Sequence, residues 1–201
     1  MSAAPTTGLR TRSRRDDFLQ VAAELFAERG YGGTSVDDVG AALGVSGPAV
    51  YWHFASKEAL LTQMLAGISD RLLEGGSRCV ADAAGHRDAL AALVRWQVEF
   101  ALEHPELIRV HARDLAHVPE PARRAIRRTQ RRYVEQWVEA LGGIAPGVDA
   151  SVRRAATHAA IGLINSTPYL GESLDRPAMA GLLEEMALAS LYRAVGATED
   201  G

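Results

Sequence analysis

The stretch of residues 30–60 constrains the fold of this chain more than any other. It reads GYGGTSVDDVGAALGVSGPAVYWHFASKEAL. Apolar residues recur at helical spacing in its first half, after a Thr-Ser pair that can cap the first amides of a helix. Gly44 stands where that helix must stop, and a turn there favours a residue that tolerates positive φ. Ser46 can cap the next short helix, and Pro48 falls in its first turn, where a missing N–H has no cost.

Two short helices joined by a tight turn form a helix-turn-helix, whose second helix enters the major groove of DNA. The groups exposed on the second helix are small, which allows close approach to base edges. Tyr51, Trp52 and His53 follow with ring groups that can reach phosphates. Ser56 can cap a further helix that begins with Lys57, the only lysine of the chain. The pattern predicts a small DNA-reading domain.

The same stretch resembles the helix-turn-helix of the TetR family of ligand-responsive transcriptional repressors. The resemblance is carried by Gly30, Tyr31, Thr34, Ser35, Val36, Val39, Leu43, Gly44, Val45, Ser46, Ala49, Val50, Tyr51, His53, Phe54, Ser56, Lys57, Glu58 and Leu60. Gly40 departs from the family pattern by replacing an alanine, which lowers helix propensity by about 1 kcal/mol. The pair Gly47-Pro48 shifts a glycine by one position. By motif position, the resemblance implies DNA contacts from Thr34, Ser35, Ser46, Gly47, Pro48, Ala49, Tyr51, Trp52, His53 and Lys57.

The net charge of −3 shows that DNA affinity cannot come from bulk positive charge and must come from local placement of cations. The N-terminal arm supplies Arg10, Arg12, Arg14 and Arg15 without an acid among them. Two interpretations are open: the arm contacts the DNA backbone or minor groove, or it is a disordered tail without fixed contacts.

The remaining composition is that of an ordinary soluble globular protein, 47% hydrophobic and 23% charged. The single cysteine, Cys79, excludes an internal disulfide and is typical of a reducing compartment. No apolar run approaches the length of about 20 residues that spans a bilayer. We therefore expect a cytoplasmic protein without membrane contact.

The rest of the chain predicts an all-α fold of about nine helices without a repeat. Besides the two reader helices, the expected helices cover residues 12–29, 57–74, 87–103, 105–116, 119–141, 150–168 and 176–195. We expect Gly75-Gly76 to end or kink the helix of residues 57–74. Gly142-Gly143 should end the helix of residues 119–141, and Asp149 should cap the helix that follows. The predicted organisation is a disordered arm (1–10), a helix-turn-helix domain (11–60) and an effector-binding and dimerisation domain (61–201).

A reader of this kind binds half a site, so specific binding to a palindromic operator requires a homodimer. The last two expected helices offer apolar surface for it. One carries Ala155, Ala156, Ala159, Ala160 and Gly162, and the other carries Leu182, Leu183, Met186, Leu188, Leu191 and Tyr192. The resemblance implies a four-helix bundle across a two-fold axis. The alternative is that these residues all belong to the core of one chain.

Aromatic and polar residues between the reader and these helices are candidates for an effector pocket, which the family resemblance also implies. The candidate ligand-binding residues are Trp96, Phe100, His104, Arg127, Arg131, Tyr133, Trp137, Asn165 and Tyr169. The alternative for the aromatic stripes is plain core packing. Either way, no cofactor is expected.

An arginine stripe follows the pattern RRxxRRxxRR: Arg123, Arg124, Arg127, Arg128, Arg131 and Arg132. Guanidinium groups bind phosphates through paired hydrogen bonds. The segment also resembles regulators that sense acyl-CoA thioesters. The alternative is a face that is solvated or paired with acids of other helices.

Catalytic patterns are not found in the sequence: the six histidines lack the spacing of a metal site, and no nucleophile elbow or phosphate loop is present. We therefore expect neither an enzyme nor a metal site. The prediction is a homodimeric DNA-binding repressor that a small-molecule effector, such as an acyl-CoA or another lipophilic compound, releases from its operator. The alternative is an architectural or regulatory DNA-binding protein without a ligand.

Overall fold

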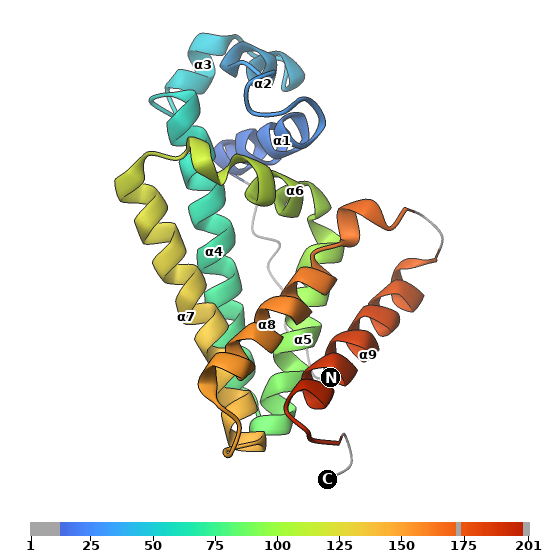
Figure 1. Cartoon of the computed structure of the whole chain (residues 1–201). Helices are drawn as coiled ribbons and strands as arrows, with labels where there is room; N and C mark the ends of the chain where they lie inside the picture. The colour runs from blue at the N-terminus through green and yellow to red at the C-terminus, as the bar shows by residue number, and fades with distance from the viewer. Residues whose placement is uncertain (1–12, 172–173, 199–201) are drawn as a thin grey trace, which may run out of the picture.

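The computed structural model describes residues 13–171 and 174–198, in which all regular secondary structure is helical (Figure 1). The elements of these residues are α1 (Arg14–Arg29), α2 (Val36–Ala42), α3 (Gly47–Tyr51), α4 (Lys57–Asp82), α5 (His86–Glu103), α6 (Pro105–Asp114), the 3₁₀-helix η1 (Leu115–His117), α7 (Glu120–Ile144), α8 (Ala150–Ile164), the 3₁₀-helix η2 (Thr167–Tyr169) and α9 (Arg176–Ala194). The predicted all-α fold is confirmed. Helices α1–α3 form one end of the molecule, and α4 runs from there into the larger bundle (Figure 1). No described helix is long and apolar enough to cross a membrane.

The start of each reader helix follows from its local sequence. Ser13 caps α1 and Ser35 caps α2, each in a reciprocal capping box with an aspartate three residues later. Gly44 has φ of 68°, so the predicted turn at this residue is confirmed. Ser46 precedes α3, but its side chain makes no capping hydrogen bond. The predicted side-chain cap at Ser46 is therefore wrong, while Pro48 does occupy the first turn.

Helix α4 continues through Gly75-Gly76 to Asp82, so the predicted end at these glycines is wrong. Both glycines are buried. A methyl group at Gly75 would overlap the indole ring of Trp96, and one at Gly76 would overlap the ring of Tyr133. The glycines thus let α5 and α7 approach α4, and this packing outweighs a propensity loss of about 1 kcal/mol for each glycine.

Two other helix ends differ from the predicted ones. Helix α7 passes through Gly142-Gly143 and ends at Ile144, because these glycines allow close contact with Arg153 and His86. Helix α8 starts at the predicted cap, where the side chain of Asp149 accepts from the Ser151 amide at 2.7 Å. It ends at Ile164, earlier than predicted, and η2 follows as a separate turn.

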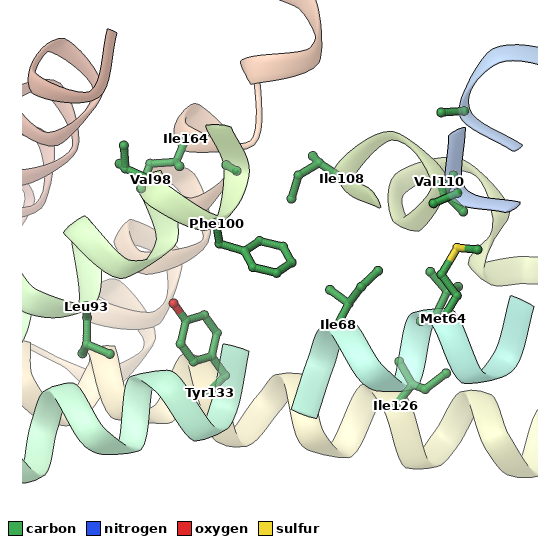
Figure 2. Close-up of a cluster of buried hydrophobic side chains, with 14 of the residues drawn as sticks. Met64, Ile68, Leu93, Val98, Phe100, Ile108, Val110, Ile126, Tyr133 and Ile164 are labelled. Atoms are coloured by element: carbon green, nitrogen blue, oxygen red, sulfur yellow. The ribbon is translucent and has the colours of Figure 1, made fainter. Parts of the chain in front are cut away.

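The buried core extends from the reader into the bundle without interruption. Phe18 and Phe26 of α1 are fully buried at the reader end. Figure 2 shows the bundle part, where Met64 and Ile68 of α4 face side chains of α5, α6 and α7. Each large buried apolar side chain contributes roughly 1.5–3 kcal/mol to the stability of the fold.

Candidate DNA-binding surface and effector cavity

The exposed surface of the reader lies on α3 and the turn after it. The predicted DNA contacts whose side chains are exposed or half-buried there and at the start of α2 are Ser35, Ser46, Pro48, Ala49, Tyr51, Trp52 and His53. Trp52 is 89% exposed and Tyr51 is 52% exposed. The ring of His53 is held on Phe18, with centroids 5.2 Å apart. This surface presents aromatic and hydroxyl groups of the kind that contact phosphates and base edges.

Three other predicted contacts are engaged within the reader. Thr34 is 2% exposed, and its hydroxyl donates to the carbonyl oxygens of Leu25 in α1 and of Gly30. Nζ of Lys57 donates to the carbonyl oxygens of Tyr31 at 2.8 Å and of Thr34 at 2.9 Å, and it lies 4.2 Å from the centre of the Tyr31 ring. Gly47 is buried against Asp37. We therefore propose that Thr34, Gly47 and Lys57 position the reader, while direct DNA contacts from these residues stay a prediction.

Part of the basic N-terminal arm packs on the reader. The guanidinium of Arg15 lies 5.0 Å from the ring centre of Phe54, and that of Arg14 packs on the ring of Phe18. Arg10 and Arg12 lie outside the described residues.

A cavity of about 190 Å³ lies inside the bundle between α4, α5, α6, α7 and α8. It is lined by Ile68, Ser69, Leu72, Gln97, Ile108, His111, Gln130, Tyr133, Val134, His158, Ile161 and Asn165. Ile68 of α4, Ile108 of α6 and Tyr133 of α7, which line this cavity, are among the side chains drawn in Figure 2. Seven of these twelve lining residues carry polar side chains. The cavity wall is therefore mixed in polarity.

One hydrogen-bonded group in the cavity wall joins α7, α5 and α8. The hydroxyl of Tyr133 donates to Oε1 of Gln97 at 3.0 Å, and Nε2 of Gln97 donates to Oδ1 of Asn165 at 2.9 Å. Burial raises the pKa of Tyr133, so its hydroxyl is neutral at pH 7. This group is uncharged, and the tyrosine hydroxyl, as the donor to Gln97, fixes the direction of its hydrogen bonds.

A second group joins α7, α4 and α6. Nε2 of Gln130 donates to Oγ of Ser69 at 3.3 Å and contacts Nε2 of His111. Burial lowers the pKa of His111, so the imidazole is neutral at pH 7 and can accept this hydrogen bond. The second group is thus also uncharged.

The cavity adjoins an open hollow of about 500 Å³ between α7 and α8. Gln130, Val134 and His158 line both spaces. Arg127, Arg131 and Arg154 line the outer hollow, together with Glu135. Because Glu135 is already paired with Arg154, the mouth of the cavity is positively charged.

The six arginines of the stripe on α7 divide into two sets. Arg123 and Arg124 pair with Glu120 on their own helix. Within the described residues, Arg127, Arg128, Arg131 and Arg132 form no hydrogen bond or ion pair. The interpretation in which acids of other helices neutralise the stripe is therefore not supported for these four side chains.

The comparison with known proteins decides the family. Residues 18–64 match the family described as "Bacterial regulatory proteins, tetR family", and residues 83–169 match the "Tetracyclin repressor-like, C-terminal domain". The transcriptional repressor KstR2 of Mycolicibacterium smegmatis is 31% identical over 149 residues, which are 72% of this chain and 71% of that protein. The chain belongs to the TetR family. The match to KstR2 of Rhodococcus jostii, at 33% identity over 105 residues, spans about half of that relative's length, 52%.

Solved structures of TetR-family proteins share the fold along nearly the whole chain. A regulator from Bordetella parapertussis is similar with a TM-score of 0.79 and 26% identity, over 89% of this chain and 95% of that one. AibR, solved in complex with isovaleryl coenzyme A and operator DNA, is similar with a TM-score of 0.73 and 22% identity, over 87% of this chain and 97% of that one.

Four of the residues predicted to bind the effector lie at the cavity of this TetR-family protein. Tyr133 and Asn165 line the cavity, and Arg127 and Arg131 line its mouth. The two arginines lie one turn apart on α7, and Tyr133 follows them on the same helix. The structure therefore brings these four residues to two adjoining spaces.

The other five predicted residues lie elsewhere. Phe100 and His104 line a separate hollow of about 330 Å³ between α1, α4, α5 and α6. Trp96 packs on α4 and Trp137 is fully buried, while Tyr169 is 74% exposed. A stripe of aromatic residues at i and i+4 identifies a buried face, but it does not tell which part of that face borders a void.

Five polar lining residues were not among those predicted to bind the effector. They are Ser69, Gln97, His111, Gln130 and His158. A signal existed for two of them, since Ser69 follows Ile68 on the apolar face of α4 and Gln97 lies beside Val98 on that of α5. A polar residue within an apolar helix face indicates a cavity wall better than a further aromatic residue does.

Helix α6 connects the cavity to the TetR-family reader. Ile108 and His111 of this helix line the cavity. Two residues after His111, Arg113 donates to the carbonyl oxygen of Phe26 in α1 and pairs with the buried Asp114 at 2.9 Å. A displacement of α6 by a cavity ligand would therefore act directly on α1.

An apolar face on α8 and α9 remains exposed in the single chain. Of the residues predicted for a dimer interface, those exposed are Ala155, Ala159, Gly162, Leu182 and Met186. Ala160, Leu183, Leu191 and Tyr192 are instead buried in the core of their own chain. The predicted interface is corrected accordingly: these four residues hold α9 on the bundle and are not available to a second chain.

Proposed function

We propose that this protein is a homodimeric transcriptional repressor that leaves its operator when an acyl-CoA thioester binds in the bundle. The observation that carries the proposal is that a cavity with two uncharged hydrogen-bonded groups in its wall adjoins a hollow lined by Arg127, Arg131 and Arg154. An acyl-CoA has the matching division into an uncharged acyl group and an anionic, phosphate-bearing carrier. Guanidinium groups bind phosphate oxygens through paired, charge-assisted hydrogen bonds.

Two copies of the reader would bind the two halves of a palindromic operator, with half-sites about 34–36 Å apart. Ser46, Pro48 and Ala49 would approach base edges, while Tyr51 and Trp52 would contact the backbone. The exposed apolar face of α8 and α9, which includes Leu182 and Met186, supports the dimer.

The effector would act through helices that touch both the cavity and the reader. Helix α6 contributes Ile108 and His111 to the cavity and holds α1 through Arg113. Helix α4 contributes Ser69 to the cavity and holds the α1–α2 connection through Lys57. A ligand that favours a different position of these helices would shift the population of dimers away from the operator-binding spacing.

The relatives support this assignment in general terms. The curated relatives named KstR2 are described as transcriptional repressors. AibR has been solved with isovaleryl coenzyme A and operator DNA on a similar fold. The acyl-CoA assignment itself rests on the charge and polarity of the residues in this chain.

The proposal is tested by fluorescence anisotropy of labelled DNA from immediately upstream of the gene, bound by the purified full-length chain. Acyl-CoAs, coenzyme A and free acids are added at constant ionic strength, since DNA binding depends on salt. Release by acyl-CoAs at concentrations at which coenzyme A and the free acids have no effect is expected. Persistent DNA binding in the presence of every thioester would contradict the proposed effector.

A matched pair of variants tests the arginine-lined mouth. The double variant Arg127→Gln, Arg131→Gln should require at least about tenfold more acyl-CoA for release, because each lost charge-assisted hydrogen bond is worth about 1.5–3 kcal/mol. Arg128→Gln, Arg132→Gln removes the same charge from the same helix outside the hollow. An equal effect of both pairs would show that only the general charge of α7 matters.

A further inference from the structure

The size of the cavity limits the part of the effector that it can enclose. Its volume is about 190 Å³, below the range of about 300–1,000 Å³ usual for drug-sized ligands. The cavity therefore suits a small group better than a long saturated acyl chain.

The polar groups of the wall are only partly used by one another. In the group formed by Tyr133, Gln97 and Asn165, both amide oxygens accept a hydrogen bond from a protein donor. Nδ2 of Asn165, in contrast, donates to no atom of the described residues, and it is not among their fully buried unpaired atoms. Because Asn165 lines the cavity, its amide group can donate to a molecule bound there.

The position of Asn165 places these donors away from the charged mouth. On the cavity side of α8, His158 lines both the mouth and the cavity, and Asn165 follows it at the end of the helix. The two residues are separated along the helix by about 10 Å, at 1.5 Å per residue. An acyl group that enters from the arginines would thus meet Asn165 with its far end.

We propose that the effector carries a short acyl group with a neutral oxygen, as a ketone or hydroxyl, near the end remote from the thioester. This inference rests on the proposed function and names the acyl class within it. The remote oxygen accepts a hydrogen bond from Nδ2 of Asn165, and the apolar part lies against Ile68, Ile108 and Ile161. A plain alkyl group would leave the amide donors without an acceptor, which lowers affinity.

The test is isothermal titration calorimetry on the purified full-length chain without DNA. The ligands are hexanoyl-CoA, two oxohexanoyl-CoAs with the ketone at carbon 3 or carbon 5, and palmitoyl-CoA. The compound with the ketone at carbon 5 should bind about tenfold or more tightly than hexanoyl-CoA and than the compound with the ketone at carbon 3, because a remote oxygen alone gives the Asn165 amide an acceptor. Palmitoyl-CoA should bind more weakly than hexanoyl-CoA and than this oxohexanoyl-CoA.

Variants at the same position show whether Asn165 is responsible. Asn165→Leu keeps the approximate volume and removes the donors, so it should abolish the preference for the oxo compound. Asn165→Asp keeps the shape and replaces the donors by acceptors, so it should weaken oxohexanoyl-CoA binding more than hexanoyl-CoA binding. Ser166→Ala is the control, because the Ser166 hydroxyl donates to the carbonyl of Leu163 and the residue does not line the cavity. Thermal unfolding of each variant verifies that it is folded.

Two results would overturn the inference in different ways. Equal affinity for oxo and plain chains, or tighter binding of palmitoyl-CoA, would exclude an oxygenated short acyl group and leave the proposed acyl-CoA repressor standing. Absence of binding for all four thioesters, in a chain that still binds DNA, would exclude both the inference and the proposed effector class.

Discussion

Lys57 illustrates how a single side chain can hold the reader together. Its ammonium group donates to two carbonyl oxygens of the α1–α2 connection and lies over the ring of Tyr31. These contacts join the start of α4 to residues between the first two helices. A cation in this place satisfies main-chain acceptors that would otherwise lose solvent without compensation.

Replacing Lys57 by methionine should lower the stability of the fold. The variant keeps the apolar stem and loses two hydrogen bonds from a charged donor, so we expect a loss of about 2 kcal/mol. The free energy of unfolding is measured by urea titration. Arg128→Met serves as the control, because this exposed arginine forms no hydrogen bond or ion pair within the described residues, and its loss should cost less than about 0.5 kcal/mol. Unchanged stability together with weaker DNA binding would instead identify Lys57 as a phosphate contact.

The exposed residues of α3 should divide into two functional classes. Tyr51→Ala should weaken binding to operator and random DNA alike, because a contact to the backbone carries no sequence information. Changes at Pro48 or Ala49 should alter the preference among operator variants, because these residues face base edges. Competition binding with operator and random DNA separates the two effects. Equal losses on both DNAs for Ala49 variants would refute a role in base reading.

The sequence allowed part of the site to be predicted at the level of residues. The reader surface follows from local sequence, because caps, the turn at Gly44 and the exposed aromatics all lie within residues 30–60. The cavity does not, because its wall combines residues of five helices. Tyr133 was predicted correctly as a cavity residue, whereas Trp137 on the same stripe is core, and only the packing of α5 and α8 decides between them.

At the scale of elements, α4 is the helix that unites the two parts of the molecule. It begins beside α3 in the reader, contributes Ser69 and Leu72 to the cavity, and ends at the far end of the bundle (Figure 1). Its glycines at positions 75 and 76 are surrounded by side chains of α5 and α7. Close packing therefore stabilises α4 at the two glycines, where its helix propensity is lowest.

Two alanine substitutions in α4 should have opposite effects. Gly75→Ala places a methyl group on the ring of Trp96, so it should destabilise the fold by about 1–3 kcal/mol despite the gain in propensity. Gly67→Ala, in the same helix, has no atom within 4 Å of the new methyl group and should stabilise by about 0.5–1 kcal/mol. Thermal unfolding of both variants gives the comparison. A stabilising Gly75→Ala would show that α5 does not pack on α4 as described.

The difference between the glycines of this chain explains which helix ends could be predicted. Gly30 and Gly44 adopt φ of 83° and 68°, a conformation that other residues rarely adopt, so these glycines do end or turn the chain as expected. Gly75 and Gly76 lie within a helix, and a side chain at either position would overlap a ring of a neighbouring helix. The sequence does not distinguish a glycine kept for conformation from one kept for contact.

At the scale of the whole molecule, the proposed interface can be broken without disturbing the core. Met186→Arg introduces a charge into the exposed face of α9, where Met186 is 46% exposed in the single chain. Sedimentation velocity should show a monomer, with DNA affinity reduced because one reader contacts half a site. Val80→Arg changes an equally exposed residue of α4 away from this face and should stay dimeric. A dimer that persists in Met186→Arg would place the interface elsewhere.

The central claim is that effector binding in the bundle and operator binding at the reader are coupled. Thermodynamic linkage requires this coupling to be reciprocal. The most direct measurement is the affinity of an acyl-CoA that releases DNA, determined by calorimetry for the free protein and for the saturated protein–operator complex. The acyl-CoA should bind the complex more weakly than the free protein, by the same factor by which it weakens operator binding. Equal acyl-CoA affinity with and without operator would contradict this coupling, because a ligand that does not distinguish the two states cannot shift their populations.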